Sequence, residues 1–117
     1  MASEISSLER KTGTAVPVSA LRTKSSLMCG EFLDLIPFAD FCKKSGLSII
    51  QILPVNDTGT ESSPYSALSA FALHPMYISL TALPEFDPLS DGGKKTEVLR
   101  KKHESDARFS YALVRKE

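Results

Sequence analysis

The residues best suited to chemistry lie in one polar stretch, PVNDTGTESSPYSALSAFALHP, at positions 54–75. Its DTG tripeptide, residues 57–59, is the one that presents the catalytic carboxylate in aspartic proteases, and 117 residues is the length of a protease that works as a twofold dimer. That chemistry requires the aspartate to pair with a second carboxylate, so that the two share one proton. Pro54 and Asn56 interrupt the apolar run where a strand would hold Asp57. A small dimeric aspartic protease is therefore the weaker interpretation.

Other polar residues of this stretch suit ligand binding. Asn56 and Asp57 directly follow an apolar run, where they can bind ligand hydroxyls or cap the loop through side-chain to backbone hydrogen bonds. Tyr65 combines an apolar ring with a polar hydroxyl, which suits either a binding surface or a buried anchor after a turn. His74 precedes a proline, and we interpret it as structural. For Asn56, Asp57 and Tyr65 both choices stay open at this level.

Two apolar segments predict the strands that would position this stretch. Residues 12–21 form a short run with small and β-branched residues, and Pro17 marks a strand edge or a strand end within it. Residues 47–55 are almost entirely apolar and rich in isoleucine, which is typical of a parallel strand that is buried on both faces. The polar loop follows the second strand, so it lies at the edge where α/β proteins bind ligands.

The segment between these strands predicts a helix. Residues 30–46 repeat apolar side chains at the spacing of one helical face. A proline at position 37 places the start of the helix near Leu35, with Asp34 as its cap. Gly46 ends it, after two lysines that suit a last turn. Strand, helix and strand together predict a βαβ unit.

The rest of the chain gives weaker signals. Residues 56–65 are predicted to be a long polar loop, residues 66–73 a short helix-like piece, and residues 74–83 a strand or an extended stretch. Residues 84–93 contain many helix-breaking residues and predict a linker. Residues 94–117 show a polar helical pattern with interleaved charges, typical of a solvated helix face.

Composition narrows the class of protein. Fourteen basic and fourteen acidic residues cancel, which does not favour nucleic-acid or membrane partners. Residues 1–12 are a polar lead-in without the apolar core of a secretion signal. Cys29 and Cys42 are too few for a disulfide framework and lack the spacing of a zinc site, so we expect reduced thiols, no metal and a cytoplasmic location.

Four motifs occur in a fixed order: VPVSALRT, GEFLDL, ILPVNDT and SPYSALSAFALHPMYISL. Together they resemble the N-terminal part of the catalytic barrel of 4-alpha-glucanotransferases, the amylomaltase or disproportionating-enzyme family (glycoside hydrolase family 77). The residues of these motifs are most similar to those of the second plant-type disproportionating enzyme. The resemblance covers residues 11–85.

The resemblance implies a (β/α)8 barrel that cleaves an α-1,4-glucan with retention and passes the glucosyl segment to a 4-hydroxyl. Retention needs two close carboxyl groups, which the family carries on later strands. None of the catalytic residues is therefore expected within these 117 residues. Residues 13–117 would be the first part of an incomplete barrel, whose partners are the rest of the barrel and a glucan or maltooligosaccharide. No cofactor is implied.

The resemblance also assigns roles to residues. The family's SPY motif, here Ser63 to Tyr65, places its tyrosine against the sugar near the cleavage point, and Ser63 would add a backbone or hydroxyl contact. Asn56 and Asp57 would lie beside it. Thr60 stands where short amylomaltases carry an aromatic residue, so a glucan contact there is not expected. The alternatives are a non-catalytic remnant that binds glucan and an α-amylase-type hydrolase.

Overall fold

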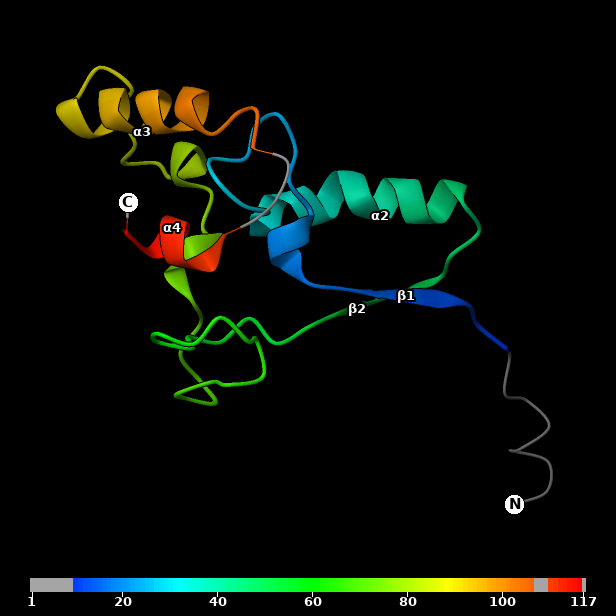
Figure 1. Ribbon diagram of the computed structural model, residues 1–117. Helices are drawn as coiled ribbons and strands as arrows, with labels where there is room; N and C mark the ends of the chain where they lie inside the picture. Colours follow the sequence, from blue (N-terminus) through cyan, green and yellow to red (C-terminus); the bar gives the residue numbers. More distant parts are fainter. Residues whose placement is uncertain (1–9, 107–109, 117) are drawn as a thin grey trace.

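A computed structural model describes residues 10–106 and 110–116 of the chain. In Figure 1, a pair of strands and the helix α2 form one part, while α3, α4 and the segments that lead to them lie beyond the carboxyl ends of the strands. The elements with their bounds are β1 (Gly13–Val16), η1 (Val18–Ala20), η2 (Phe32–Asp34), α2 (Leu35–Lys44), β2 (Ile49–Ile52), η3 (Pro75–Tyr77), η4 (Leu80–Ala82), α3 (Asp91–Lys102) and α4 (Tyr111–Lys116). Within the described residues, no helix is long and apolar enough to cross a membrane.

The predicted βαβ unit is confirmed. β1 and β2 pair in parallel, with Gly13 opposite Ile49 and Val16 opposite Ile52. Both strands are shorter than predicted. β1 ends at Val16, because Pro17 has no N–H to donate and the chain turns into η1 directly after it. β2 ends at Ile52, the residue that pairs with Val16. The prediction that the second strand is buried on both faces is wrong: Ile49 is 47% exposed, since α2 is the only helix beside the strand pair in the described part of the chain.

Helix α2 begins at Leu35 as predicted and ends at a glycine. Gly46 has a φ of 79°. The N–H of Gly46 donates to the carbonyl of Lys43 at 3.1 Å, and the N–H of Leu47 donates to that of Cys42 at 2.9 Å. These two bonds form a Schellman motif, which satisfies the last carbonyls of the helix.

Asp34 stands at the N-cap position of α2 as predicted, but its side chain makes no capping bond to that helix. The carboxylate instead accepts the N–H of Glu31 at 2.7 Å and the hydroxyls of Thr23 and Ser26, each also at 2.7 Å. Asp34 is buried, and it ties the segment after β1 to the short helical turn that precedes α2.

Two predictions between the loop and α3 are wrong. Residues 66–73 are irregular, with bends and a bridge at Leu73, rather than a helix. Ser69 Oγ accepts the N–H groups of Phe71 and Ala72 and so competes with helical bonding. Residues 74–83 contain the two turns η3 and η4 rather than a strand. A proline stands at the first position of η3, and the side chain of the preceding His74 accepts the N–H of Met76, so a helical turn begins there.

The predicted linker at 84–93 and helix at 94–117 are partly wrong. Helix α3 begins inside the linker, at Asp91, because Ser90 caps it by accepting the N–H of Gly93 at 3.0 Å. It ends at Lys102, and a separate helix, α4, begins at Tyr111. Residues 1–9 of the lead-in and residues 107–109 and 117 of the predicted helix lie outside the described residues.

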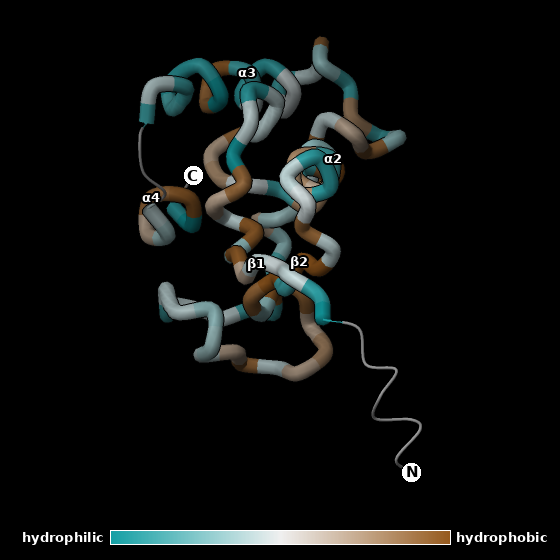
Figure 2. The backbone as a smooth tube through the Cα atoms, turned by 90° about the vertical axis from the view of Figure 1, so that its right-hand side faces the viewer, coloured by the Kyte–Doolittle hydropathy of each residue, from teal (hydrophilic) through white to brown (hydrophobic). Residues whose placement is uncertain are grey.

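The core of the described residues joins the segment after β1 to α2 and η3. Its buried apolar side chains are Val18, Met28, Cys29, Cys42 and Tyr77. Tyr77 packs against Phe32, with ring centroids 5.5 Å apart. α3 is mostly hydrophilic along its length (Figure 2). Large apolar side chains stay exposed, including Phe71 at 93%.

Candidate functional site

A cavity of about 220 Å³ lies where β1 and β2 end. Pro17 and Leu53, which directly follow the two strands, form one side of it. Several hydroxyl, amide and imidazole groups face it from the loop after β2, from η3 and from α4. Its remaining lining residues are Ser19, Asn56, Thr58, Ser62, Pro64, His74, Met76, Tyr77 and Tyr111. A cavity with polar groups at the carboxyl ends of parallel strands is where α/β proteins bind ligands.

Of the predicted binding residues, Asn56 lines this cavity. Its backbone forms an isolated antiparallel bridge with Leu73, which fixes the residue where the chain leaves β2. Asp57 caps the loop, one of the two roles left open: its Oδ1 accepts the N–H of Gly59 at 2.8 Å. Gly59 has a φ of 59°, so this turn favours glycine. Asp57 thus shapes the loop, and it lines an adjoining cavity of about 760 Å³ rather than this one.

Ser63 and Tyr65 lie beside the cavity rather than in its wall, which contains their neighbours Ser62 and Pro64. Ser63 Oγ accepts the N–H of Tyr65 at 3.3 Å, so Ser63 orients the backbone of the tyrosine. Tyr65 is 71% exposed and is not a buried anchor. Its ring is therefore free to pack against a ligand that reaches the loop from solvent.

A hydrogen-bond network that sequence reasoning missed is centred on Tyr111. Its hydroxyl donates to the carbonyl of Gly59 at 2.7 Å and lies 2.9 Å from His74 Nε2 and 3.0 Å from Thr58 Oγ1. His74 also takes part in the local fold, because its Nδ1 accepts the N–H of Met76 at 3.2 Å. No pattern in the sequence signals Tyr111, because it is 52 residues from Gly59 and 37 from His74.

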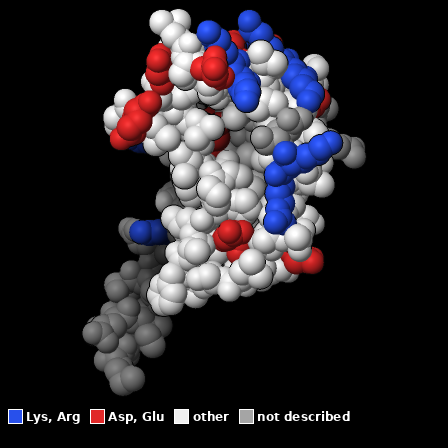
Figure 3. All heavy atoms as spheres, turned by 90° about the vertical axis from the view of Figure 1, so that its left-hand side faces the viewer, with Lys and Arg blue, Asp and Glu red and all other residues white. Residues whose placement is uncertain are grey.

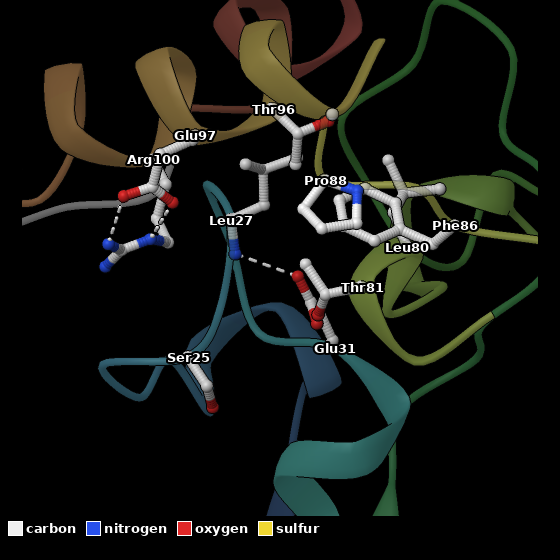
Figure 4. A pocket seen from close by; sticks show the side chains of 11 residues that line it. Ser25, Leu27, Glu31, Leu80, Thr81, Phe86, Pro88, Thr96, Glu97 and Arg100 are labelled. Carbon is white, nitrogen blue, oxygen red and sulfur yellow. Dashed lines mark hydrogen bonds and ion pairs between the residues drawn. The ribbon is translucent and has the colours of Figure 1, made fainter. Parts of the chain in front are cut away.

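Another cavity, of about 330 Å³, lies between the segment after β1, η4 and α3. Figure 4 shows the Glu97–Arg100 pair on one side and Leu80 and Phe86 on the other, with Leu27 and Glu31 between them. Burial raises the pKa of the Glu31 carboxyl above its ordinary value of 4.5. Glu31 Oε1 accepts the N–H of Leu27 at 2.8 Å. The carboxyl group therefore stabilises the fold of the loop, and this cavity is mainly apolar.

The charges on α3 match the solvated face expected from the sequence. Glu97 accepts two bonds from Arg100, at 2.7 and 3.0 Å, and lies 3.7 Å from Lys101 Nζ. Figure 3 shows acidic side chains among the basic ones on this face. In the described part of the chain, no cluster of three or more His, Cys, Asp or Glu side chains could hold a metal ion.

A family model described as 4-alpha-glucanotransferase, for glycoside hydrolase family 77, matches residues 16–117. The chain belongs to this family. The resemblance drawn from the four motifs is confirmed, and membership excludes the aspartic protease interpretation of the DTG tripeptide.

Relatives of the chain carry the same description. The 4-alpha-glucanotransferase of Chlamydia pneumoniae is 44% identical over 107 residues, which cover 90% of this chain and 20% of the relative. That of Chlamydia trachomatis is 53% identical over 74 residues, 63% of this chain and 14% of the relative. The rice protein 4-alpha-glucanotransferase DPE2 is 41% identical over 102 residues, 83% of this chain and 10% of the relative.

The chain therefore spans a fifth or less of the length of these 4-alpha-glucanotransferases. No solved structure matches it significantly. The two parallel strands and their connecting helix are consistent with part of the family's α/β domain.

Proposed function

We propose that the chain forms the first strand–helix–strand unit of the (β/α)8 barrel of a 4-alpha-glucanotransferase. The barrel would transfer a segment of an α-1,4-glucan to the 4-hydroxyl of glucose or another glucan by a retaining double displacement. The observation that carries the proposal is the polar cavity at the ends of β1 and β2 in a chain of this family. Active sites of (β/α)8 barrels lie at this end of the strands.

In this proposal the chain binds sugar and the chemistry comes from elsewhere. The nucleophile and the acid/base belong outside residues 1–117, on later strands of the barrel. Retention requires these two carboxyl groups to lie about 5 Å apart. Glu31 and Asp34 do not suit this role, because both are buried and accept backbone N–H groups.

The exposed ring of Tyr65 would pack against the apolar face of a glucosyl unit, with its hydroxyl free for a hydrogen bond. Asn56 would bind a sugar hydroxyl from the cavity wall. Ser63 and Asp57 would hold the loop in shape through their bonds to the N–H groups of Tyr65 and Gly59. The reaction needs no cofactor, because the two carboxyl groups supply nucleophile and proton.

The test is the product pattern from maltotriose, using the protein made from the natural reading frame that encodes this chain. Transfer gives glucose and maltopentaose from two molecules of maltotriose, whereas hydrolysis gives glucose and maltose. We expect the transfer products. Hydrolysis alone would favour the amylase-type alternative, and binding of maltotriose without products would favour the non-catalytic remnant.

A pair of variants tests the site itself. Tyr65→Ala should weaken maltotriose binding about tenfold, since loss of one aromatic contact and its hydrogen bond removes about 1–2 kcal/mol. The matched control is Phe41→Ala on α2, an aromatic residue that is 61% exposed and lies outside the cavity wall. Equal affinities for both variants would contradict the assignment of Tyr65.

A further inference from the structure

Tyr111, in α4, forms a hydrogen bond to the loop at residues 57–61, which leads to the proposed sugar-binding residues. This loop begins directly after Asn56 and turns at Gly59. Inside the loop, Thr58 Oγ1 donates to the carbonyl of Glu61 at 2.7 Å. From outside, the hydroxyl of Tyr111 donates to the carbonyl of Gly59 at 2.7 Å. The turn is thus tied to α4, 52 residues away in the sequence.

His74 gives this bond its direction. Its Nδ1 accepts the N–H of Met76 at 3.2 Å, so the neutral ring carries its proton on Nε2. That Nε2 lies 2.9 Å from the hydroxyl of Tyr111 and can only donate to it. With a lone pair of Tyr111 occupied in this way, its proton is directed to the carbonyl of Gly59. The rings of His74 and Tyr111 meet edge to face, with centroids 5.7 Å apart.

The same two side chains line the cavity at the strand ends together with Asn56 and Thr58. Thr58 is buried, so movement of the turn would change the cavity wall. The bonds from His74 through Tyr111 to Gly59, which we term the Tyr111 latch, therefore connect the shape of the binding cavity to α4.

We propose that Tyr111 and His74 are positioning residues for glucan binding, which hold the loop at residues 57–61 in the conformation that accepts the sugar. The inference rests on the proposed function, because it concerns the same cavity. It assigns α4 a role in the site that neither residue type nor spacing suggests.

The two nitrogens of His74 allow a test that separates positioning from folding. Glutamine places an amide N–H near the position of Nε2 and can still donate to Tyr111. Asparagine places its oxygen near the position of Nδ1 and keeps only the bond to Met76. Maltotriose affinity would be measured by titration on the protein made from the natural reading frame, as the wild type and as Tyr111→Phe, His74→Gln and His74→Asn. Hydrogen exchange of the Gly59 amide would be measured in parallel.

We expect Tyr111→Phe and His74→Asn to weaken maltotriose binding about fivefold, the factor for one lost hydrogen bond, and to speed exchange at Gly59. His74→Gln should retain the affinity and the exchange rate of the wild type. Equal affinities for all four proteins, or loss of affinity in His74→Gln as large as in His74→Asn, would overturn the inference while leaving the proposed function intact. Absence of maltotriose binding by the wild-type protein would overturn both.

Discussion

The described residues form two regions that are held together in different ways. Residues 13–52 form a strand–helix–strand unit, in which backbone bonds of the strands and α2 combine with short-range bonds to the carboxylates of Glu31 and Asp34. Residues 56–106 and 110–116 have little regular structure before α3, and single side chains hold them in place, some across more than 50 residues of sequence. Interactions are distributed in the first region and concentrated in the second.

The junction between the regions shows how few side chains attach the second region to the first. Arg22, in the segment after β1, donates to the backbone carbonyl of His103 and to that of Asp106, the latter at 2.8 Å. These carbonyls follow the end of α3, where a cation also meets the negative end of the helix dipole. One guanidinium group therefore binds both carbonyls, and beside it Arg100 Nη1 donates a longer bond, 3.5 Å, to the carbonyl of Lys24. Loss of single side chains should matter more in the second region than in the first.

The largest effect is expected from Gly30→Ala, which breaks the first region. An alanine Cβ would lie 1.9 Å from the carbonyl oxygen of Val18 and 2.7 Å from the N of Leu21, both backbone atoms that cannot turn aside. We expect a loss of more than ~3 kcal/mol in the free energy of unfolding, measured by urea denaturation. The control is Gly92→Ala in α3, where the nearest atom is 3.8 Å away and stability should rise slightly.

Arg22→Ala should separate the two regions at a smaller cost. Loss of two hydrogen bonds from a charged group to carbonyls should destabilise the docking of α3 by about 2 kcal/mol. Hydrogen exchange is expected to accelerate in α3 and to stay unchanged in β1 and β2. The control is Lys94→Ala at an exposed position of α3, which should change stability by less than about 0.5 kcal/mol. Uniform acceleration across both regions would contradict the concentration of contacts at Arg22.

Gly46→Ala tests whether the first region can be destabilised without loosening α3. No atom lies within 4 Å of the added Cβ, so only the φ of 79° opposes the substitution. The expected loss is about 1 kcal/mol, seen as a lower melting temperature with unchanged exchange in α3. An equal loss of protection in α3 would show that the two regions unfold together.

The smallest effect concerns Glu31, whose carboxyl group has a pKa raised above 4.5 by burial. The folded chain therefore holds this proton more tightly than the unfolded chain does. The resulting stabilisation is complete below pH 4.5 and is lost as the pH rises through the raised pKa. Glu31→Gln keeps an oxygen for the N–H of Leu27 but cannot ionise. The free energy of unfolding of this variant, relative to that of the wild type, should therefore increase as the pH rises. Parallel stability curves from pH 4 to 8 would contradict this.

Sequence patterns predicted the first region because its determinants are local. Apolar spacing places α2, Gly46 ends it, and two apolar runs predict paired strands. The extent of burial was not predictable, because it depends on what covers Ile49 rather than on the residue itself.

In the second region, side-chain bonds and long-range contacts determine the structure more than local sequence patterns do. The apolar residues at 66–73 suggested a helix, but the hydroxyl of Ser69 bonds to the backbone there instead. Family motifs indicated Asn56 and Tyr65 as binding residues, which remains a prediction. Tyr111 could not be found from the sequence, since its partners lie more than 35 residues away.

The buried state of the two cysteines has a practical consequence for labelling. Cys29 is 2% exposed and burial raises its pKa to about 12, so almost no thiolate is present at neutral pH to react with an alkylating dye. Cys42 is also 2% exposed. A cysteine introduced at an exposed position would therefore react selectively without removal of the native thiols, and one fluorophore could be attached at a chosen point on the surface.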